Sequence, residues 1–149
     1  MKNYTSKNSL QIIGIKDIPE IKPGTNLTNI IVQGIRKQKL KIEDRNIIVV
    51  AQKIVSKAEG QIINLNNIKP STFASIFASK SGRDPRLIEL ILQQSKQIIR
   101  MDINKGILIT ETIHGLICAN SGVDSSNVEG PNYVTILPEN PDFSAKKIS

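Results

Sequence analysis

Four consecutive polar residues in the C-terminal third of the sequence could bind a divalent cation. Asp124 supplies a carboxylate, Ser125 and Ser126 supply hydroxyl groups, and Asn127 supplies a side-chain amide. Oxygen atoms of these kinds suit a hard cation such as Mg²⁺ or Mn²⁺, and such cations commonly accompany nucleotide phosphates. The same residue types also form Asx and serine turns, and on composition alone an ordinary turn is the simpler interpretation. The residue order of an EF-hand loop is absent.

The elements around this cluster predict where its side chains would lie. Residues 115–118 form a short apolar run typical of a strand, so Asp124 would follow soon after that strand ends. Residues 47–55 predict a buried strand, and residues 61–65 predict a second one. Lys57 would then lie on the loop that joins these two strands. A loop lysine is commonly just solvated, and the sequence has no P-loop motif, so the residues alone leave a phosphate role open.

The remaining elements follow from helical spacing, capping residues and apolar runs. Helices are predicted over residues 27–35, 73–82 and 85–99, and further strands over residues 106–111 and 133–137. The third helix has Asp84 as its N-cap and Pro85 as its first residue. These elements predict an α+β fold, a mixed sheet with packed helices, in a single domain spanning residues 1–149.

The net charge of +7 raises the question of a nucleic-acid partner. A compact basic cluster at the end of the first predicted helix consists of Arg36, Lys37, Lys39 and Lys41. Cations at such a position also complement the helix dipole, and a solvated face is the ordinary interpretation. Aromatic residues make up 3% of the chain and do not interleave with this cluster, so a stacking platform for single strands is lacking. We therefore do not expect a nucleic-acid partner.

Cysteine and histidine each occur only once, as Cys118 and His114. A single cysteine excludes an intrachain disulfide, and a single histidine argues against a zinc site with nitrogen and sulfur ligands and against a Ser-His-Asp triad. The apolar stretches are too short to cross a bilayer, and the N-terminus lacks the apolar segment of a signal peptide. We expect a cytoplasmic protein without a membrane partner.

Three longer motifs occur in order along the chain. They are VAQKIVSKAEG at residues 50–60, CANSGVDSSNVEG at residues 118–130 and ILPENPDFSA at residues 136–145. With these motifs, and with a further matching segment at residues 18–24, the chain resembles the F420-0:gamma-glutamyl ligase family. The resemblance covers nearly the whole chain, and it implies the N-terminal part of that family's two-domain fold.

The resemblance implies an enzyme, an acid–amino-acid ligase of coenzyme F420 biosynthesis. Such an enzyme uses GTP and a divalent cation, Mg²⁺ or Mn²⁺, to join L-glutamate through its amino group to the terminal carboxylate of a deazaflavin coenzyme precursor. The carboxylate is activated as an acyl phosphate, which the amine then attacks, while metal and cationic side chains stabilise the transferring phosphoryl group. Members of the family form intertwined homodimers, so a homodimer is expected.

The resemblance also implies roles for individual residues. Asp124 matches the metal-binding carboxylate and Lys57 matches a lysine that meets the nucleotide, so both are expected to serve catalysis. Asn127 matches a nucleotide-contacting amide. The other matched nucleotide-contacting positions are Gln52, Lys53, Ile18, Pro19, Glu20 and Ile21. Main-chain groups are expected to make several of these contacts, because two isoleucines and a proline offer no polar side-chain group.

The family's pattern continues beyond the last residue, Ser149. The further part would hold a second Asp-Thr metal motif and more of the nucleotide pocket, so we expect this chain to be the N-terminal portion of the ligase and to be inactive by itself. Residues 142–148 predict a helix that has only just begun, with Asp142 as its N-cap. The alternative function is a noncatalytic nucleotide-binding module or a basic module that interacts with nucleic acid.

Overall fold

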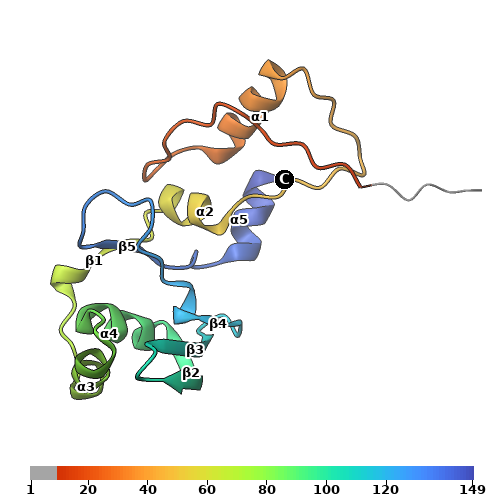
Figure 1. The fold of residues 1–149 in the computed structure, drawn as a ribbon. Helices are drawn as coiled ribbons and strands as arrows, with labels where there is room; N and C mark the ends of the chain where they lie inside the picture. Colours follow the sequence, from red (N-terminus) through yellow and green to blue (C-terminus); the bar gives the residue numbers. More distant parts are fainter. Residues whose placement is uncertain (1–9) are drawn as a thin grey trace, which may run out of the picture.

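The chain contains both helices and strands, and the computed structural model describes residues 10–149 (Figure 1). The helices are α1 (Leu27–Lys37), α2 (Gln52–Ala58), α3 (Thr72–Ser81), α4 (Pro85–Gln93) and α5 (Pro141–Ile148). The strands are β1 (Ile62–Asn64), β2 (Ser95–Asp102), β3 (Ile107–Thr112), β4 (Ile117–Ala119) and β5 (Tyr133–Thr135), with single 3₁₀ turns η1 (Leu65–Asn67) and η2 (Asn120–Gly122). No helix among the described residues is long and apolar enough to cross a lipid bilayer.

The strands form two small antiparallel sheets. One has the order β2-β3-β4, and the other pairs β1 with β5, where Ile63 lies opposite Val134. The turns that join β2 to β3 and β3 to β4 are short, and short turns join antiparallel strands, whereas a parallel pair needs a crossover of about a dozen residues or more. The α+β fold class is confirmed. The described strands make two antiparallel sheets in place of the one mixed sheet that the sequence predicted.

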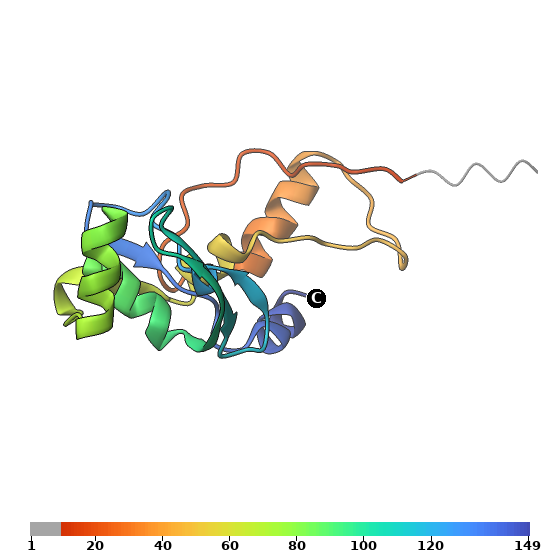
Figure 2. The ribbon, with the colours of Figure 1, turned by 60° about the horizontal axis from the view of Figure 1, so that its bottom comes forward.

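The larger core packs the helix pair α3 and α4 against Leu108 of the three-stranded sheet and Val134 of β5. Figure 2 shows the two helices beside the three-stranded sheet. α4 begins with Asp84 as N-cap and Pro85 in its first turn, as the sequence predicted. Ser71 caps the start of α3, and Gly82 caps its end. The largest side chains that this core buries fully are Phe77, Ile88, Ile91, Leu108 and Val134.

A smaller core joins α1 and α2 to the N-terminal loop. α1 begins at Leu27 because the Asn26 side chain accepts a hydrogen bond from the Asn29 main chain at 2.9 Å. Its apolar face turns toward the α2 side of the molecule, where Val55 is buried. The buried members of this core are Ile21, Leu27, Ile31, Ile35 and Val55. The core therefore fixes α2 next to the N-terminal loop.

α5 closes the chain beside α1 and α2. Asn140 is its N-cap, not the predicted Asp142, because the Asn140 side chain accepts a hydrogen bond from the main chain of Phe143. The Ser144 hydroxyl hydrogen-bonds Glu59 at the end of α2. α5 therefore holds the C-terminal end of α2 in place.

The strand predicted over residues 47–55 is wrong. Its first half runs extended without a strand partner in the described part of the chain, and Ile47 and Val49 are each 88% exposed. Its second half is the start of α2, which packs Val55 into the smaller core. The β-branched run favours a strand, but a strand also needs a neighbour for its backbone hydrogen bonds. Lys57 accordingly lies in the last turn of a helix and not on a loop.

The third predicted helix is shorter than the sequence indicated. α4 ends at Gln93, and β2 begins at Ser95. The Ser95 hydroxyl donates a hydrogen bond to the main-chain oxygen of Ile91 at 2.5 Å, at the point where the helix ends. Ile99 fits both a helical and a strand pattern, and its neighbours Ile98 and Arg100 pair with β3 residues that lie beyond a local sequence window. Strand pairing therefore overrides the helical spacing here.

Candidate functional site

Helix α2 carries two lysines that reach the polar loop found in the sequence. Lys53 and Lys57 are four positions apart, so they lie on one face of the helix. Residues 124–127 lie against that face. The loop is held there because the Asp124 main chain donates to Thr135 at 3.0 Å and accepts from Thr135 at 2.8 Å. The predicted cation-binding cluster and the predicted nucleotide-contacting lysines are therefore neighbours in the structure.

Lys53 binds the carboxylate of Asp124. The Lys53 Nζ lies 2.6 Å from Oδ2 of Asp124 and also donates a hydrogen bond to the Ser126 hydroxyl. The Ser126 main chain donates to the other carboxylate oxygen, Oδ1, at 2.8 Å. This last contact is an Asx turn, so the turn interpretation and the ligand interpretation of this sequence are compatible. The turn orients the carboxylate toward the lysine face of α2.

The Asp124 carboxyl group is ionised at neutral pH. Partial burial raises its pKa, but hydrogen bonds from Lys53 and Ser126 and the positive charge of Lys53 lower it. Together these influences leave the pKa below the ordinary value of an aspartate. An ionised carboxylate is a ligand that hard divalent cations accept.

Lys57 is the more deeply held of the two lysines, with a side chain 12% exposed. Its ammonium group pairs with the Glu20 carboxylate and donates to the main-chain oxygen of Asn127 at 3.1 Å. Glu20 is 37 positions earlier in the sequence, on the N-terminal loop. Lys57 therefore joins three separate segments: the N-terminal loop, α2 and the loop after η2.

Apolar side chains fix the N-terminal loop on both sides of Glu20. Ile21 is buried and Ile18 is half-buried, and both belong to the smaller core. Pro19 is exposed. Polar contacts from this segment are consequently left to the Glu20 carboxylate and to main-chain groups.

Gln52 turns away from the two lysines. Its side-chain amide donates to the Ser56 hydroxyl at 2.6 Å and to the main-chain oxygen of Ile136 at 3.4 Å. The Gln52 side chain therefore ties α2 to the segment after β5. Asn127 enters the site through its main-chain oxygen, on a backbone with a φ of 57°.

Sequence reasoning gave no individual role to Ser126 and no partner to Glu20. A serine two positions after an aspartate is typical of an Asx turn, so the Ser126 contact had a local signal. The contact between Glu20 and Lys57 spans 37 positions and had none. The shared face of Lys53 and Lys57 would have been evident if the helix had been predicted.

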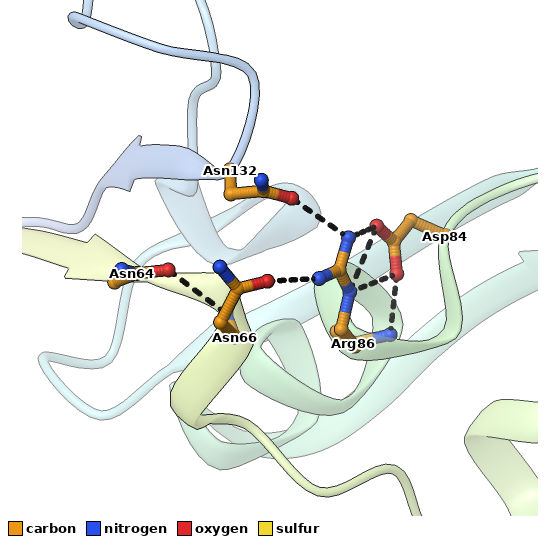
Figure 3. Close-up of polar contacts among 5 residues, drawn as sticks. All are labelled: Asn64, Asn66, Asp84, Arg86 and Asn132. Carbon is orange, nitrogen blue, oxygen red and sulfur yellow. Dashed lines mark hydrogen bonds and ion pairs between the residues drawn. The ribbon is translucent and has the colours of Figure 1, made fainter.

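A second polar cluster anchors the far end of the same loop (Figure 3). Arg86, in the first turn of α4, pairs with Asp84 at 2.6 Å. The Nη1 atom of Arg86 donates to the side chain of Asn66 at 2.6 Å, and its Nη2 atom donates to the side chain of Asn132 at 3.0 Å. Because these residues satisfy most of the guanidinium donors, we assign the cluster a structural role. The loop from Asp124 to Asn132 is thus held at both ends.

One residue of the site, Asp124, could serve as a ligand of a divalent cation. Residues 10–149 contain no group of three or more His, Cys, Asp and Glu side chains arranged to hold a metal ion. Asp124 offers one ionised carboxylate, and Mg²⁺ is commonly held by one or two carboxylates together with substrate phosphates and waters. The donor set is therefore suited to part of a coordination shell that the phosphates would complete.

Comparisons with known proteins were consistent with one family. A family model described as F420-0:Gamma-glutamyl ligase matches residues 14–149. The chain is 42% identical over 139 residues to the coenzyme F420:L-glutamate ligase of Methanothermobacter thermautotrophicus, covering 93% of this chain and 54% of that protein. The corresponding ligase of Methanocaldococcus jannaschii is 42% identical over 144 residues, covering 95% and 53%, and that of Methanopyrus kandleri is 38% identical over 142 residues, covering 93% and 53%. The chain spans about half the length of these curated relatives. On this basis the chain belongs to the F420-0:gamma-glutamyl ligase family.

Proposed function

We propose that this chain contributes the nucleotide- and cation-binding part of a ligase that adds L-glutamate to a deazaflavin coenzyme. In the proposed reaction a coenzyme carboxylate attacks the γ-phosphorus of GTP and GDP leaves. The amino group of L-glutamate then displaces phosphate from the acyl phosphate and forms the amide. The activity for which the relatives are named supports the glutamate and coenzyme substrates.

One observation carries the proposal. Lys53 and Lys57 belong to one motif and Asp124 belongs to another, about seventy positions away in the sequence. The three side chains nevertheless meet in one site, with Lys53 bound to Asp124 and Lys57 bound to the main chain of the same loop. Charged side chains that converge from distant motifs are typical of a functional site.

The charge balance of the site supports GTP together with a divalent cation as the co-substrate. Two lysines face two carboxylates, so +2 and −2 sum to zero over these four side chains. A nucleoside triphosphate adds several negative charges, and Mg²⁺ or Mn²⁺ at Asp124 would neutralise part of them and polarise the transferring phosphoryl group.

The lysines would serve this reaction as positioned point charges. Lys57 is held by Glu20 and by the Asn127 main chain, so its ammonium group is placed before a phosphate binds and little ordering remains. Lys53 sits beside the metal ligand, where a phosphate oxygen bound to the cation would also lie within its reach.

Asp124→Asn tests the metal assignment, because it removes the charge and keeps the shape of the side chain. GTP is titrated into both proteins with and without Mn²⁺, and circular dichroism serves as the folding control. We expect Mn²⁺ to raise the GTP affinity of the wild-type chain and not that of the variant. Asp102→Asn, which removes a carboxylate 3.7 Å from the exposed Lys105, is the matched control and should behave as wild type. Equal metal-dependent affinity in the Asp124 variant and the wild type would overturn the assignment.

A further inference from the structure

The Asp124 carboxylate is already paired with a cationic side chain, that of Lys53. The Lys53 ammonium group lies on Oδ2 at 2.6 Å, and the Ser126 main chain donates to Oδ1 at 2.8 Å. A divalent cation would need at least one of these oxygens.

We propose that Lys53 competes with the divalent cation for Asp124 and gives up the carboxylate only when a nucleotide arrives. In the nucleotide-free protein the ammonium group neutralises Asp124. When a cation bound to a nucleoside triphosphate enters, the carboxylate binds the cation and Lys53 moves to a phosphate oxygen. This inference rests on the proposed function and adds a coupling between the two ligands.

The two lysines differ in the way that this exchange requires. The Lys53 side chain is 22% exposed, and its ammonium group contacts only side chains of the loop, those of Asp124 and Ser126. The four-carbon stem of a lysine allows its ammonium group to move. Lys57 is 12% exposed and is fixed by a main-chain oxygen as well as by Glu20. Lys53 is therefore the mobile cation of the site, and Lys57 is the fixed one.

The exchange makes cation and nucleotide binding cooperative. Without a nucleotide, the cation must displace Lys53 from Asp124 and leave the ammonium group without a partner. With a nucleotide, phosphate replaces the partner that Lys53 loses. By linkage, each ligand must then raise the affinity for the other by the same factor.

Lys53→Met should change the two affinities in opposite directions. Mn²⁺ affinity of the nucleotide-free chain should rise about 2- to 5-fold, the range expected for losing a partly exposed ion pair as competitor. Affinity for GTP in the presence of Mn²⁺ should fall, because the phosphate contact is lost. A lysine with only a structural role would lower both affinities or neither. Free Mn²⁺ is measured by electron paramagnetic resonance, titrated into the millimolar range, and GTP binding by calorimetry.

Two lysine variants control for the loss of one positive charge. Lys105→Met removes an exposed lysine 3.7 Å from Asp102, away from the site, and Lys57→Met removes a lysine on the same helix that pairs with Glu20. Neither should raise Mn²⁺ affinity by as much as Lys53→Met. Lys53→Gln provides a second substitution at the same position if the methionine variant does not fold.

The outcomes separate this inference from the function on which it rests. A rise in Mn²⁺ affinity confined to the Lys53 variants supports the exchange. Unchanged or lower Mn²⁺ affinity in the Lys53 variants, with wild-type GTP binding still dependent on Mn²⁺, overturns the exchange and leaves the proposed function standing. Wild-type protein that binds GTP no better with Mn²⁺ than without it would overturn both.

Discussion

Replacing Lys57 with methionine is expected to weaken GTP binding far more than guanosine binding. Methionine keeps an unbranched, flexible stem that can fill the same space, while the ammonium group is lost. A hydrogen bond to a charged group contributes about 1.5 to 3 kcal/mol, so GTP affinity should fall about 10- to 150-fold. Guanosine carries no phosphate, and its affinity should be nearly unaffected.

The same substitution has a small structural cost. The Glu20 side chain is 65% exposed, so its ion pair with Lys57 contributes at most about 1 kcal/mol. The Asn127 main-chain oxygen loses one donor, which adds about 1 kcal/mol. A total of about 1 to 2 kcal/mol corresponds to a fall in Tm of about 2 to 8 °C for a chain of this length. We therefore expect the variant to stay folded at room temperature.

Calorimetric titration of GTP and of guanosine, each in the presence of Mn²⁺, separates the two effects. Lys105→Met is the matched control, since it removes an exposed lysine that pairs with Asp102 away from the site, so GTP affinity should not fall. Equal losses of affinity for GTP and guanosine in the Lys57 variant would refute the reasoning. The lysine would then act on the fold or on the base and not on phosphate.

Two further predictions concern stability. A hydrogen bond from Arg86 lowers the pKa of Asp84 below its ordinary value of 3.8 and outweighs the effect of burial. A carboxyl group whose pKa is lower in the folded state stabilises that state at pH values above the unfolded pKa. This contribution is lost as the pH falls through the folded pKa. The free energy of unfolding, measured in urea, should therefore fall below about pH 4, and less steeply in Asp84→Asn; identical pH profiles would contradict this. Gly122→Ala should cost about 1 to 3 kcal/mol more than Gly24→Ala. Both glycines have a positive φ, 72° and 83°, but only at Gly122 would a Cβ approach Leu137, at 2.6 Å; equal losses in urea denaturation would exclude the clash.

The parts of the fold that the sequence predicted correctly are those with local causes. Asp84 and Pro85 start α4, and Gly82 ends α3, and each acts within a few positions of itself. The incorrect predictions lie where residues distant in the sequence determine the secondary structure. Residues 47–50 need a strand beside them to become a strand, and Ile99 belongs to β2 because β3 pairs with the residues on either side of it.

The candidate site was also predicted only in part. The types of Asp124 and its neighbours indicated an oxygen-rich loop, and the family resemblance added both α2 lysines. Neither could show that Lys53 binds Asp124 itself or that Glu20 holds Lys57, because tertiary packing brings those pairs together. The charge balance of the site became evident only when the pairs were known.

The connection between α1 and α2 has a consequence for the integrity of the polypeptide. Every residue from 41 to 49 is exposed, regular secondary structure is absent there, and the segment includes Lys41 and Arg45. Such segments are preferred sites of proteolytic nicking, so trypsin should cut here before it cuts the packed helices. The cut would leave Glu20 and Lys57 on different fragments, while the smaller core still joins α1 to α2. A nicked molecule would give two bands on a denaturing gel and one under native conditions.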